Sequence, residues 1–487
     1  MNQESNKHIF VTAAIPYVNG APHIGHAVEF TQVDAYARYY RKQLGDDFVM
    51  ATTGSDENSL KNVRAAEEVG ADVEAFVAEK AEVFKSLFTP FNLSFNDFIR
   101  TREERHMKGA QRLWKLISPD DIYQKEYEGL YCVGCEQFYT IEECPDGTCP
   151  THKKPLEAVK ETNYFFKLSN YGDKLLELIE SGKMRVFPEG KRNEMVSFIK
   201  QGLEDFSISR SVERARNFGV PVPGDESQVM YVWVDALSNY INVLGFGEDS
   251  EMYRTFWEHA QKRTHIIGKD IARFHVVYWP AILLSAGLPV PTDVYVHGFF
   301  TMDGEKMSKS LGNTIDPFEF AQEYGTDAAR YILLREMPHA NDGDLSKQRM
   351  EERYAELANR LGNLVSRVAA MSVSYFEGKL DRIAPNWTEQ NTELAHLIED
   401  CNFKGYIDYV FEAVNQANEI VDKEQPFKLV KENPEDAKRV LSEVAEIIRW
   451  VGEVLSPIMP ETSEKILAQY QESGLVTKGD ALFPRRD

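Results

Sequence analysis

The chain has 487 residues, of which 43% are hydrophobic and 27% are charged, and its formal net charge is −22. This length predicts about two to four domains, and the acidic balance argues against a protein that coats nucleic acid through a general basic surface. A local basic face on an acidic body remains compatible with a nucleic-acid partner. No apolar run of about 18 residues occurs and the start is polar, so we expect neither a membrane span nor a signal peptide, and we expect a cytoplasmic protein.

The first 117 residues have the pattern of alternating strands and helices. Residues 8–14 (HIFVTAA) suit a buried parallel strand, and the loop over residues 15–27 (IPYVNGAPHIGHA) is rich in proline and glycine. We expect a helix over residues 28–44 and a second strand over residues 47–53. Strand, tight loop and helix in this order predict a βαβ unit.

The pattern changes over residues 118–228, where clustered cysteines and turn signals indicate an inserted domain of mixed β character. Strand-like runs resume with MYVWVDALSNYI, RTHIIGKDIARFH and DVYVHGFFTMDG, and from about residue 316 the chain reads as a helical bundle. The predicted fold class is therefore α/β: a doubly wound parallel-sheet (Rossmann-like) domain, split by an insertion and followed by an α-helical bundle. The expected divisions are 1–117, 118–228, 229–320, a connector over 321–350, and 351–487.

A pair of histidines stands where the first predicted helix begins. Residues 22–26 read PHIGH, so His23 and His26 are three residues apart and face the same side of a helix. The free N–H groups and positive dipole end of a helix suit an anionic phosphate, and Gly25 would let a nucleotide lie against bare backbone. The simpler alternative is two histidines that cap a surface turn.

A second loop carries two cations near the last predicted strand. Residues 304–313 read GEKMSKSLGN, with Lys306 and Lys309 between two glycines. Lysine offers a mobile point charge to phosphate oxygens, and glycine lets the backbone bend. An exposed loop with lysine is more often simply solvated. This loop therefore indicates a phosphate site only together with the histidine pair at residues 23–26.

In this order and in these strand contexts, HIGH and KMSKS resemble the paired signatures of the class I aminoacyl-tRNA synthetases, which flank one nucleotide at the edge of a doubly wound sheet. The resemblance implies that the catalytic residues are His23, His26, Lys306 and Lys309, which stabilise charge on the phosphates of ATP and on the departing pyrophosphate, with Mg²⁺ bound to the phosphates. It implies further ATP-binding residues: Gly25, Gly268, Asp270 at the ribose, His297 and Gly298 at the adenine, and Ser308.

The blocks AAIPYVNGAPHIGH, YVWVDALSNY and IIGKDIARFH resemble the methionyl-tRNA synthetases within this class, and the match runs through most of the chain. It implies that ATP and L-methionine form methionyl-adenylate and that the methionyl group then moves to tRNA(Met). A methionine side chain is polarisable and favours aromatic edges. The implied pocket has an aromatic-rich wall with one polar handle, Tyr17, Trp233, Tyr240 and His275, and an apolar lining of Ile15, Ala236, Leu237 and Ile271. The alternative for these aromatic residues is ordinary core packing.

The ammonium group of the substrate needs an anion, which this family supplies in a stretch usually written GTDEHG. Residues 54–59 here read GSDENS, so Asp56 keeps the carboxylate position. Asn58 and Ser59 replace the usual histidine and glycine. The departure affects the expected shape of the loop and leaves the carboxylate in place.

Four of the five cysteines lie between residues 132 and 149. Cys132 and Cys135 form a CxxC pair, and Cys149 and His152 form a CxxH pair, which together predict one structural, tetrahedral zinc site. The spacing also resembles that of single-zinc methionyl-tRNA synthetases. Cys144 is the spare thiol, and an all-cysteine set that uses it in place of His152 is the alternative. Cys401 is expected to be a small buried apolar residue.

The helical region is expected to meet tRNA. Asn363 and Arg367 are four residues apart and share one helix face, and the resemblance implies that they read anticodon bases. Phe427, after Pro426, stands where the family commonly has tryptophan, and phenylalanine can still stack on a base. The lack of a further tail domain favours a monomer.

Three other functions are compatible with parts of this pattern. One is a neighbouring class I synthetase for cysteine or a branched aliphatic amino acid, although the insertion is small for the editing domains of the aliphatic enzymes. Another is a tRNA-binding paralogue without catalysis, which the two intact signatures disfavour. The third is a small nucleotidyltransferase on the same fold, a class that lacks the zinc insertion and the helical tail.

Overall fold

The computed structural model describes residues 7–133, 137–139, 143–150, 153–307, 312–383 and 387–484. The chain divides into two compact units, neither of which is continuous in sequence. Unit 1 comprises Met1–Pro22, Leu44–Phe88 and Ser94–Val296, and unit 2 comprises His23–Gln43, Thr89–Leu93 and His297–Asp487.

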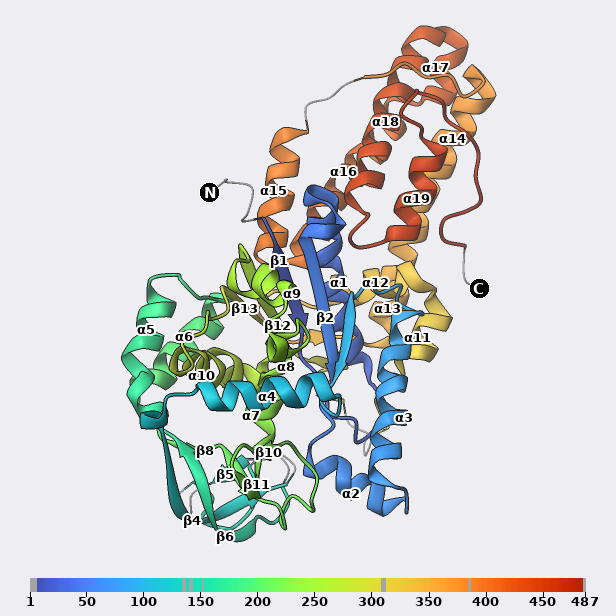
Figure 1. The fold of residues 1–487 in the computed structure, drawn as a ribbon. Helices are drawn as coiled ribbons and strands as arrows, with labels where there is room; N and C mark the ends of the chain where they lie inside the picture. The colour runs from blue at the N-terminus through green and yellow to red at the C-terminus, as the bar shows by residue number, and fades with distance from the viewer. Residues whose placement is uncertain are drawn as a thin grey trace. The chain divides into compact units, whose positions relative to one another are not determined.

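Unit 1 is built on a parallel sheet which, among the described residues, has six strands in the order β3-β2-β1-β12-β13-β7 (Figure 1). The strand β1 is fully buried, as its apolar sequence predicts, and Ile9 lies opposite both Val49 of β2 and Lys262 of β12. The chain runs outward from β1 to β3 on one side and returns beside β1 with β12, so the carboxyl end of β1 is the position where such sheets bind ligands. The strands are β1 (Ile9–Ala13), β2 (Val49–Ser55), β3 (Asp97–Arg100), β7 (Arg185–Phe187), β12 (Lys262–Gly268) and β13 (Asp293–His297).

Large aromatic side chains fill the core of unit 1. Trp257 and Trp279 are fully buried with their ring centroids 6.2 Å apart, and Tyr240 lies 6.2 Å from Trp279. The helices of this unit are α2 (Leu60–Glu68), α3 (Val73–Lys85), α4 (Glu104–Leu116), α5 (Gly172–Glu180), α6 (Glu189–Lys200), α7 (Val232–Leu237), α8 (Asn239–Asn242), α9 (Glu251–Tyr253) and α10 (Trp279–Ser285).

Residues 118–228, where an inserted domain was expected, contain small antiparallel sheets within unit 1, although their strand β7 pairs with β13 in the parallel sheet. β4 (Ile122–Cys132) pairs antiparallel with β6 (Glu157–Phe166) along its length, and these strands are flanked by β5 (Gln137–Tyr139) and β8 (Phe206–Ser207). A second small sheet contains β9 (Ser209–Ser211), β10 (Pro221–Val222) and β11 (Asp225–Met230). These strands gather at one end of the unit (Figure 1).

Unit 2 combines the helix that follows β1 with the helical bundle and a short sheet. The long amphipathic pattern predicts one continuous helical segment, and the structure has one. It consists of α13 (Lys347–Glu356), then a π-helical stretch over Leu357–Gly362, and then α14 (Asn363–Phe376). The elements are α1 (Ile24–Leu44), β14 (Phe300–Met302), β15 (Glu305–Lys306), α11 (Pro317–Tyr324), α12 (Thr326–Glu336), β16 (Gly343–Asp344), α13 (Lys347–Glu356), α14 (Asn363–Phe376), α15 (Thr388–Glu399), α16 (Phe403–Glu424), α17 (Pro426–Glu432), α18 (Pro434–Val454) and α19 (Pro460–Gln469).

A fully buried guanidinium group ties α1 to the bundle within unit 2. Arg330 on α12 lies 2.7 Å from the carboxylate of Asp34 on α1, and both side chains have no exposed surface. Arg330 also donates to the backbone carbonyls of Phe91, Pro457 and Ile458 at 2.8–2.9 Å. A charge can be buried where its donors are satisfied in this way. Arg330 is therefore one reason why α1 belongs to this unit.

Some local expectations differ from the structure. The first helix begins at Ile24 and not at residue 28, so the two histidines lie at its first turn. The block VWVDAL forms helix α7 and not a strand, because a short apolar run does not distinguish a buried helix from a buried strand. Within the described ranges, the helices are too short or too polar to cross a membrane.

Candidate active site and RNA-binding residues

The backbone around His23 and His26 determines which nitrogen of each ring carries the proton. The His23 N–H donates to His26 Nδ1 (3.1 Å), and the Gly25 N–H donates to His23 Nδ1 (3.1 Å). The two rings stack with centroids 3.7 Å apart. Because Nδ1 is the acceptor in both rings, each neutral imidazole carries its proton on Nε2, from which it can donate to a phosphate oxygen. A Cβ at Gly25 would lie 2.9 Å from His23 Cε1, which explains the glycine.

The surroundings keep His26 neutral. Burial, together with the adjacent His23 ring, lowers the pKa of His26 well below its ordinary value. The first turn of α1 supplies positive potential through its N–H groups. The site can therefore attract an anion without two charged imidazoles lying against each other.

His297, at the end of β13, is held through both ring nitrogens. Nε2 lies 3.0 Å from Glu29 Oε2 on α1, and Nδ1 lies 2.7 Å from the carbonyl oxygen of Gly298. A Cβ at Gly298 would lie 2.3 Å from the carbonyl oxygen of Asn341, so close approach of that segment requires glycine. Sequence reasoning missed Glu29, which has no local signal because its partner is 268 residues away.

Lys306 lies at the end of an exposed hairpin. Asp303 and Gly304, which join β14 to β15, have φ angles of 52° and 78°, and positive φ at both positions suits a two-residue hairpin turn. Asp344 accepts from the Gly304 N–H at 3.0 Å, and the Asn313 side chain donates to the Lys306 carbonyl at 3.3 Å. These contacts hold the two ends of the lysine loop. The other two predicted residues of this loop, Ser308 and Lys309, lie outside the described residues.

Asp56 follows β2 in unit 1 and is 3% exposed. Its N–H donates to the Pro16 carbonyl at 2.8 Å, which places it beside Tyr17 in a parallel bridge. The Asn62 amide donates to the Asp56 carbonyl at 2.8 Å. Ser59 accepts from the Lys61 N–H at 3.0 Å and so caps α2, which gives this departure from the family pattern a structural role.

An aromatic stack lies in unit 1 as part of the expected wall. Trp233 and Phe274 stack face to face, with centroids 3.7 Å apart and 7° between their planes. Tyr17 meets Trp233 edge-on, at 6.2 Å and 77°. These rings are partly buried against the core, a geometry that offers both faces and edges to an apolar ligand. Phe274 was not predicted, although it directly precedes His275 in an aromatic-rich segment.

The polar handle of the wall has one defined arrangement of protons. His275 Nδ1 lies 2.9 Å from the Ile271 carbonyl, and His275 Nε2 lies 2.6 Å from the Tyr240 hydroxyl. Because a carbonyl only accepts, Nδ1 carries the proton and Nε2 accepts from Tyr240. Burial lowers the pKa of His275 to about 4, so the ring is neutral at pH 7. The predicted lining residues Ala236 and Leu237 are buried on α7, and Ile15 and Ile271 are partly buried.

Two further predicted residues lie at the carboxyl end of β12. Gly268 is its last residue, and Asp270 is exposed in the turn Lys269–Ile271 that follows. This strand is the neighbour of β1 at the point where the strand order reverses, so Asp270 follows a strand end at the edge where sheets of this kind bind ligands.

The predicted anticodon residues belong to unit 2. Asn363 begins α14 and is exposed, whereas Arg367 donates to Asp422 (3.0 Å) and Asn418 (3.5 Å) of α16. Phe427, the second residue of α17, is 42% exposed. An exposed aromatic ring suits stacking on a nucleobase.

The cysteines of the insertion are brought together in part. Cys132, Cys144 and Cys149 are buried in one small cluster with Tyr139, against Leu130 and Leu156. Cys135 and His152 lie outside the described residues. Among the His, Cys, Asp and Glu residues that the structure describes, no group of three is placed to hold a metal ion. Cys401 is fully buried, as expected.

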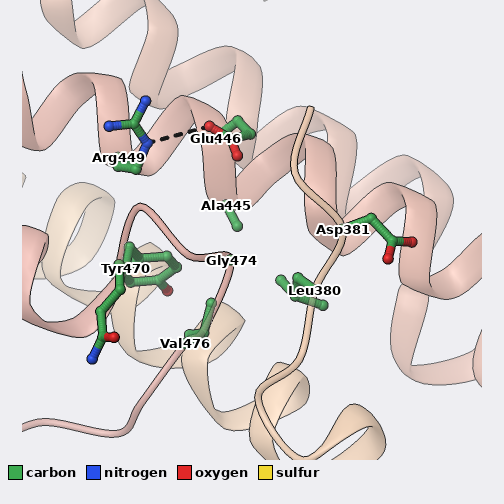
Figure 2. Close-up of a pocket in the computed structure, with 9 residues that line it drawn as sticks. Leu380, Asp381, Ala445, Glu446, Arg449, Tyr470, Gly474 and Val476 are labelled. Carbon is green, nitrogen blue, oxygen red and sulfur yellow. Dashed lines mark hydrogen bonds and ion pairs between the residues drawn. The ribbon is translucent and has the colours of Figure 1, made fainter. Parts of the chain in front are cut away.

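A small cavity in the bundle and a larger groove in unit 1 lie away from the predicted site residues. A cavity of about 10 Å³ in the bundle has room for about one water, and its wall includes the Glu446–Arg449 ion pair (Figure 2). A groove of about 710 Å³ in unit 1 is bordered by α2, β6 and β11. Its side chains Arg64 and Arg214 face Glu157 and Glu161, respectively. Because these charges are balanced locally, the groove is not a distinct anion site.

The chain is similar to known proteins over most of its length. Residues 9–156 and 151–369 match the family model described as tRNA synthetases class I (M). A methionine–tRNA ligase of Brucella suis is 41% identical over 485 residues, which cover 95% of this chain and 92% of that protein. A methionine–tRNA ligase of Clostridium acetobutylicum is 38% identical over 514 residues, which cover 99% and 78%, respectively.

Solved structures extend the comparison to the fold. The Mycobacterium tuberculosis methionyl-tRNA synthetase in complex with methionyl-adenylate superposes with a TM-score of 0.91 at 36% identity, over 98% of this chain and 100% of that one. The free form of the Mycobacterium tuberculosis protein superposes with a TM-score of 0.83 at 33% identity, over the whole of both chains.

Proposed function

The chain belongs to the methionyl-tRNA synthetases of class I, and we propose how its own side chains divide the reaction. The enzyme activates L-methionine: the methionine carboxylate attacks the α-phosphate of ATP and gives methionyl-adenylate and pyrophosphate. The methionyl group then moves to the 3′ end of tRNA(Met). Neither step needs a covalent bond to the protein, so catalysis rests on positioning and on stabilisation of developing charge.

The ATP phosphates are assigned to His23 and His26, which present Nε2–H donors at a helix N-terminus. Lys306, Ser308 and Lys309 are assigned to the pyrophosphate, Asp270 and Gly268 to the ribose, and Gly25, His297 and Gly298 to the remainder of the nucleotide. Mg²⁺ bound with ATP neutralises phosphate charge. Because the rings of His23 and His26 are neutral donors, they strengthen their hydrogen bonds as negative charge grows on the phosphate oxygens.

Methionine is assigned to unit 1. The Asp56 carboxylate pairs with the substrate ammonium group, and the side chain lies against Tyr17, Trp233, Ala236, Leu237, Tyr240, Ile271, His275 and Ile15. The observation that carries this assignment is the aromatic wall with a single neutral polar handle, Tyr240–His275. A thioether is apolar, accepts only a weak hydrogen bond and packs well against aromatic rings, whereas a charged or strongly polar side chain would leave its groups unsatisfied there.

The test is amino-acid-dependent exchange between ATP and pyrophosphate, without tRNA, for methionine, cysteine, isoleucine, leucine and valine. Exchange that is strongest with methionine is expected. Stronger exchange with another amino acid would contradict the pocket assignment. In that case Trp233 would not determine which amino acid is preferred, and Trp233→Ala should leave the amino-acid preference unchanged. Absence of exchange with all five, from folded protein, would favour a tRNA-binding protein without catalysis.

A structural zinc ion in the insertion is a further part of the proposal, with Cys132, Cys135, Cys149 and His152 as ligands. Two of these ligands support the proposal, because Cys132 and Cys149, one from each predicted pair, are buried in the same small cluster. Zinc content by elemental analysis should be one per chain, and it should fall in Cys149→Ser. If Cys144→Ser loses zinc while His152→Ala keeps it, the all-cysteine set is correct.

The tRNA anticodon is assigned to Asn363, Arg367 and Phe427 on the bundle. We also propose a monomer that works in the cytoplasm, where tRNA is charged for protein synthesis, with a catalytic domain over 1–117 and 229–320, the insertion 118–228, a connector 321–350 and the RNA-binding bundle 351–487. Sedimentation of the full chain tests the monomer, which a stable dimer at micromolar concentration would contradict.

A further inference from the structure

Both amide hydrogens and the amide oxygen of Asn58 form hydrogen bonds within unit 1. The residue is 7% exposed and lies two places after Asp56. Its Nδ2 donates to Asp235 Oδ2 (2.7 Å) and to the Thr101 carbonyl (3.2 Å), and its Oδ1 accepts from Arg102 Nη1 (3.2 Å). A reversed amide would turn its oxygen toward a carboxylate, so these partners determine its orientation.

Asp235, the strongest partner of Asn58, lies between two residues of the methionine wall. It is 1% exposed on α7, between Trp233 and Ala236 in sequence. Its second oxygen, Oδ1, lies 2.6 Å from Nε2 of the fully buried His106 on α4. Each carboxylate oxygen thus has its own side-chain donor, and removal of either donor would let the carboxylate turn.

The Asn58–Asp235 hydrogen bond links the loop that carries Asp56 to helix α7, which carries Trp233. On one side, the loop of Asp56 is fixed to Pro16 by a backbone hydrogen bond and is supported by Asn62. On the other side, α7 carries Trp233, which stacks on Phe274. A ligand that is held by its ammonium group at one place and by its side chain at another needs these two places at a fixed separation.

We propose that Asn58, acting through Asp235, is a positioning residue for methionine that fixes the Asp56 carboxylate relative to the Trp233 wall. This inference rests on the proposed roles of Asp56 and Trp233. It assigns a role to the position where this chain departs from the family motif: the amide supplies two donors, one for Asp235 and one for the backbone at Thr101. Nothing in the reaction requires Asn58 to touch the substrate.

The test exchanges donor and acceptor. Asn58→Asp places a carboxylate against Asp235, and the KM for methionine in the exchange reaction is expected to rise at least tenfold, with the KM for ATP changed less than threefold. Asn58→Asp combined with Asp235→Asn restores a donor and an acceptor between the two positions. The KM for methionine is then expected to return to within threefold of the wild-type value.

A control separates positioning from loss of stability. Asn96 accepts from the Ala51 N–H at the beginning of β2 and β3, away from their carboxyl ends, so Asn96→Ala should lower the melting temperature without a change in the KM for methionine. If Asn58→Asp does not fold, Asn58→Ala adds no charge and should still raise that KM about three- to tenfold. An unchanged KM in Asn58→Ala, or no recovery in the double variant, would overturn the inference. Wild-type protein without methionine-dependent exchange would instead overturn the proposed function itself.

Discussion

Replacement of Arg330 by methionine is expected to destabilise unit 2 by about 4 kcal/mol. Removal of one member of a buried ion pair costs about 3–5 kcal/mol, because the other charge stays buried. Arg38 Nε lies 2.7 Å from the Asp34 carboxylate and still pairs with this charge after Arg330 is replaced, which lowers the cost. Three backbone carbonyls lose their donor at the same time, which raises it.

The assay is thermal unfolding of the full chain. For a cooperative unit of about 150–250 residues, each kcal/mol lowers the melting temperature by about 2–4 °C, so the transition of unit 2 should fall by about 8–16 °C. Arg439→Met is a matched control, since Arg439 is 61% exposed and lies 3.6 Å from Asp436, and exposed pairs of this kind contribute about 0–1 kcal/mol.

A second variant tests the reason for the loss. Arg330→Met combined with Asp34→Leu removes both charges, and an apolar pair of similar volume is often no less stable than a buried ion pair. The double variant should therefore be more stable than Arg330→Met alone. A fall of less than about 2 °C in the single variant, or a double variant as unstable as the sum of the two single variants, would refute the reasoning.

Three further predictions concern the two binding sites. Burial lowers the pKa of His275 from 6.5 to about 4 in the folded protein, so the unfolded state binds the extra proton between these values. His275 alone should therefore add at most about 1.4 kcal/mol per pH unit to the rise in the stability of unit 1 between pH 4 and 6.5. Denaturant titrations across this range should show a shallower rise for His275→Gln. Phe274→Ala removes the ring stacked on Trp233 and should raise the KM for methionine about two- to tenfold, and an equal rise in the KM for ATP would argue against a specific role. Phe427→Ala should raise the KM for tRNA about five- to 150-fold with tRNA-independent exchange unchanged, because stacking on a base contributes about 1–3 kcal/mol; if Phe427→Tyr has the same effect, stacking is not the cause.

The parts of the site that sequence reasoning predicted are those with local signals. His23 and Gly25 were recognisable because glycine, proline and histidine stand together directly after an apolar strand, and the structure places them at the first turn of α1. Tyr240 and His275 were implied by the resemblance of their blocks to the methionyl-tRNA synthetases, and the structure brings the two side chains within hydrogen-bond distance. The helical bundle was predictable because its amphipathic period continues over several turns.

The missed parts depend on contacts between distant segments. Asn58 and Asp235 are 177 positions apart in the sequence, and His297 and Glu29 are 268 positions apart. No local sequence pattern therefore predicts either pair. The grouping of α1 with the bundle was not predicted for the same reason, since Arg330 is far from Asp34 in sequence. Helix α7 was predicted as part of a strand because its run is short and largely apolar, and such a run does not distinguish a buried helix from a buried strand.

The membership of α1 in unit 2 limits how this protein can be cut or recombined. A truncated chain that stops at Val296 would retain the signature histidines but lose Arg330, the buried partner of the helix that carries them. A fragment that starts at His297 would lack both Asp34 and the Phe91 carbonyl. A chimera with a bundle from a relative therefore has to carry His23–Gln43 and Thr89–Leu93 along with it. The part that has to be exchanged is thus a set of separated stretches of sequence, which contains His23 and His26 together with the helical bundle.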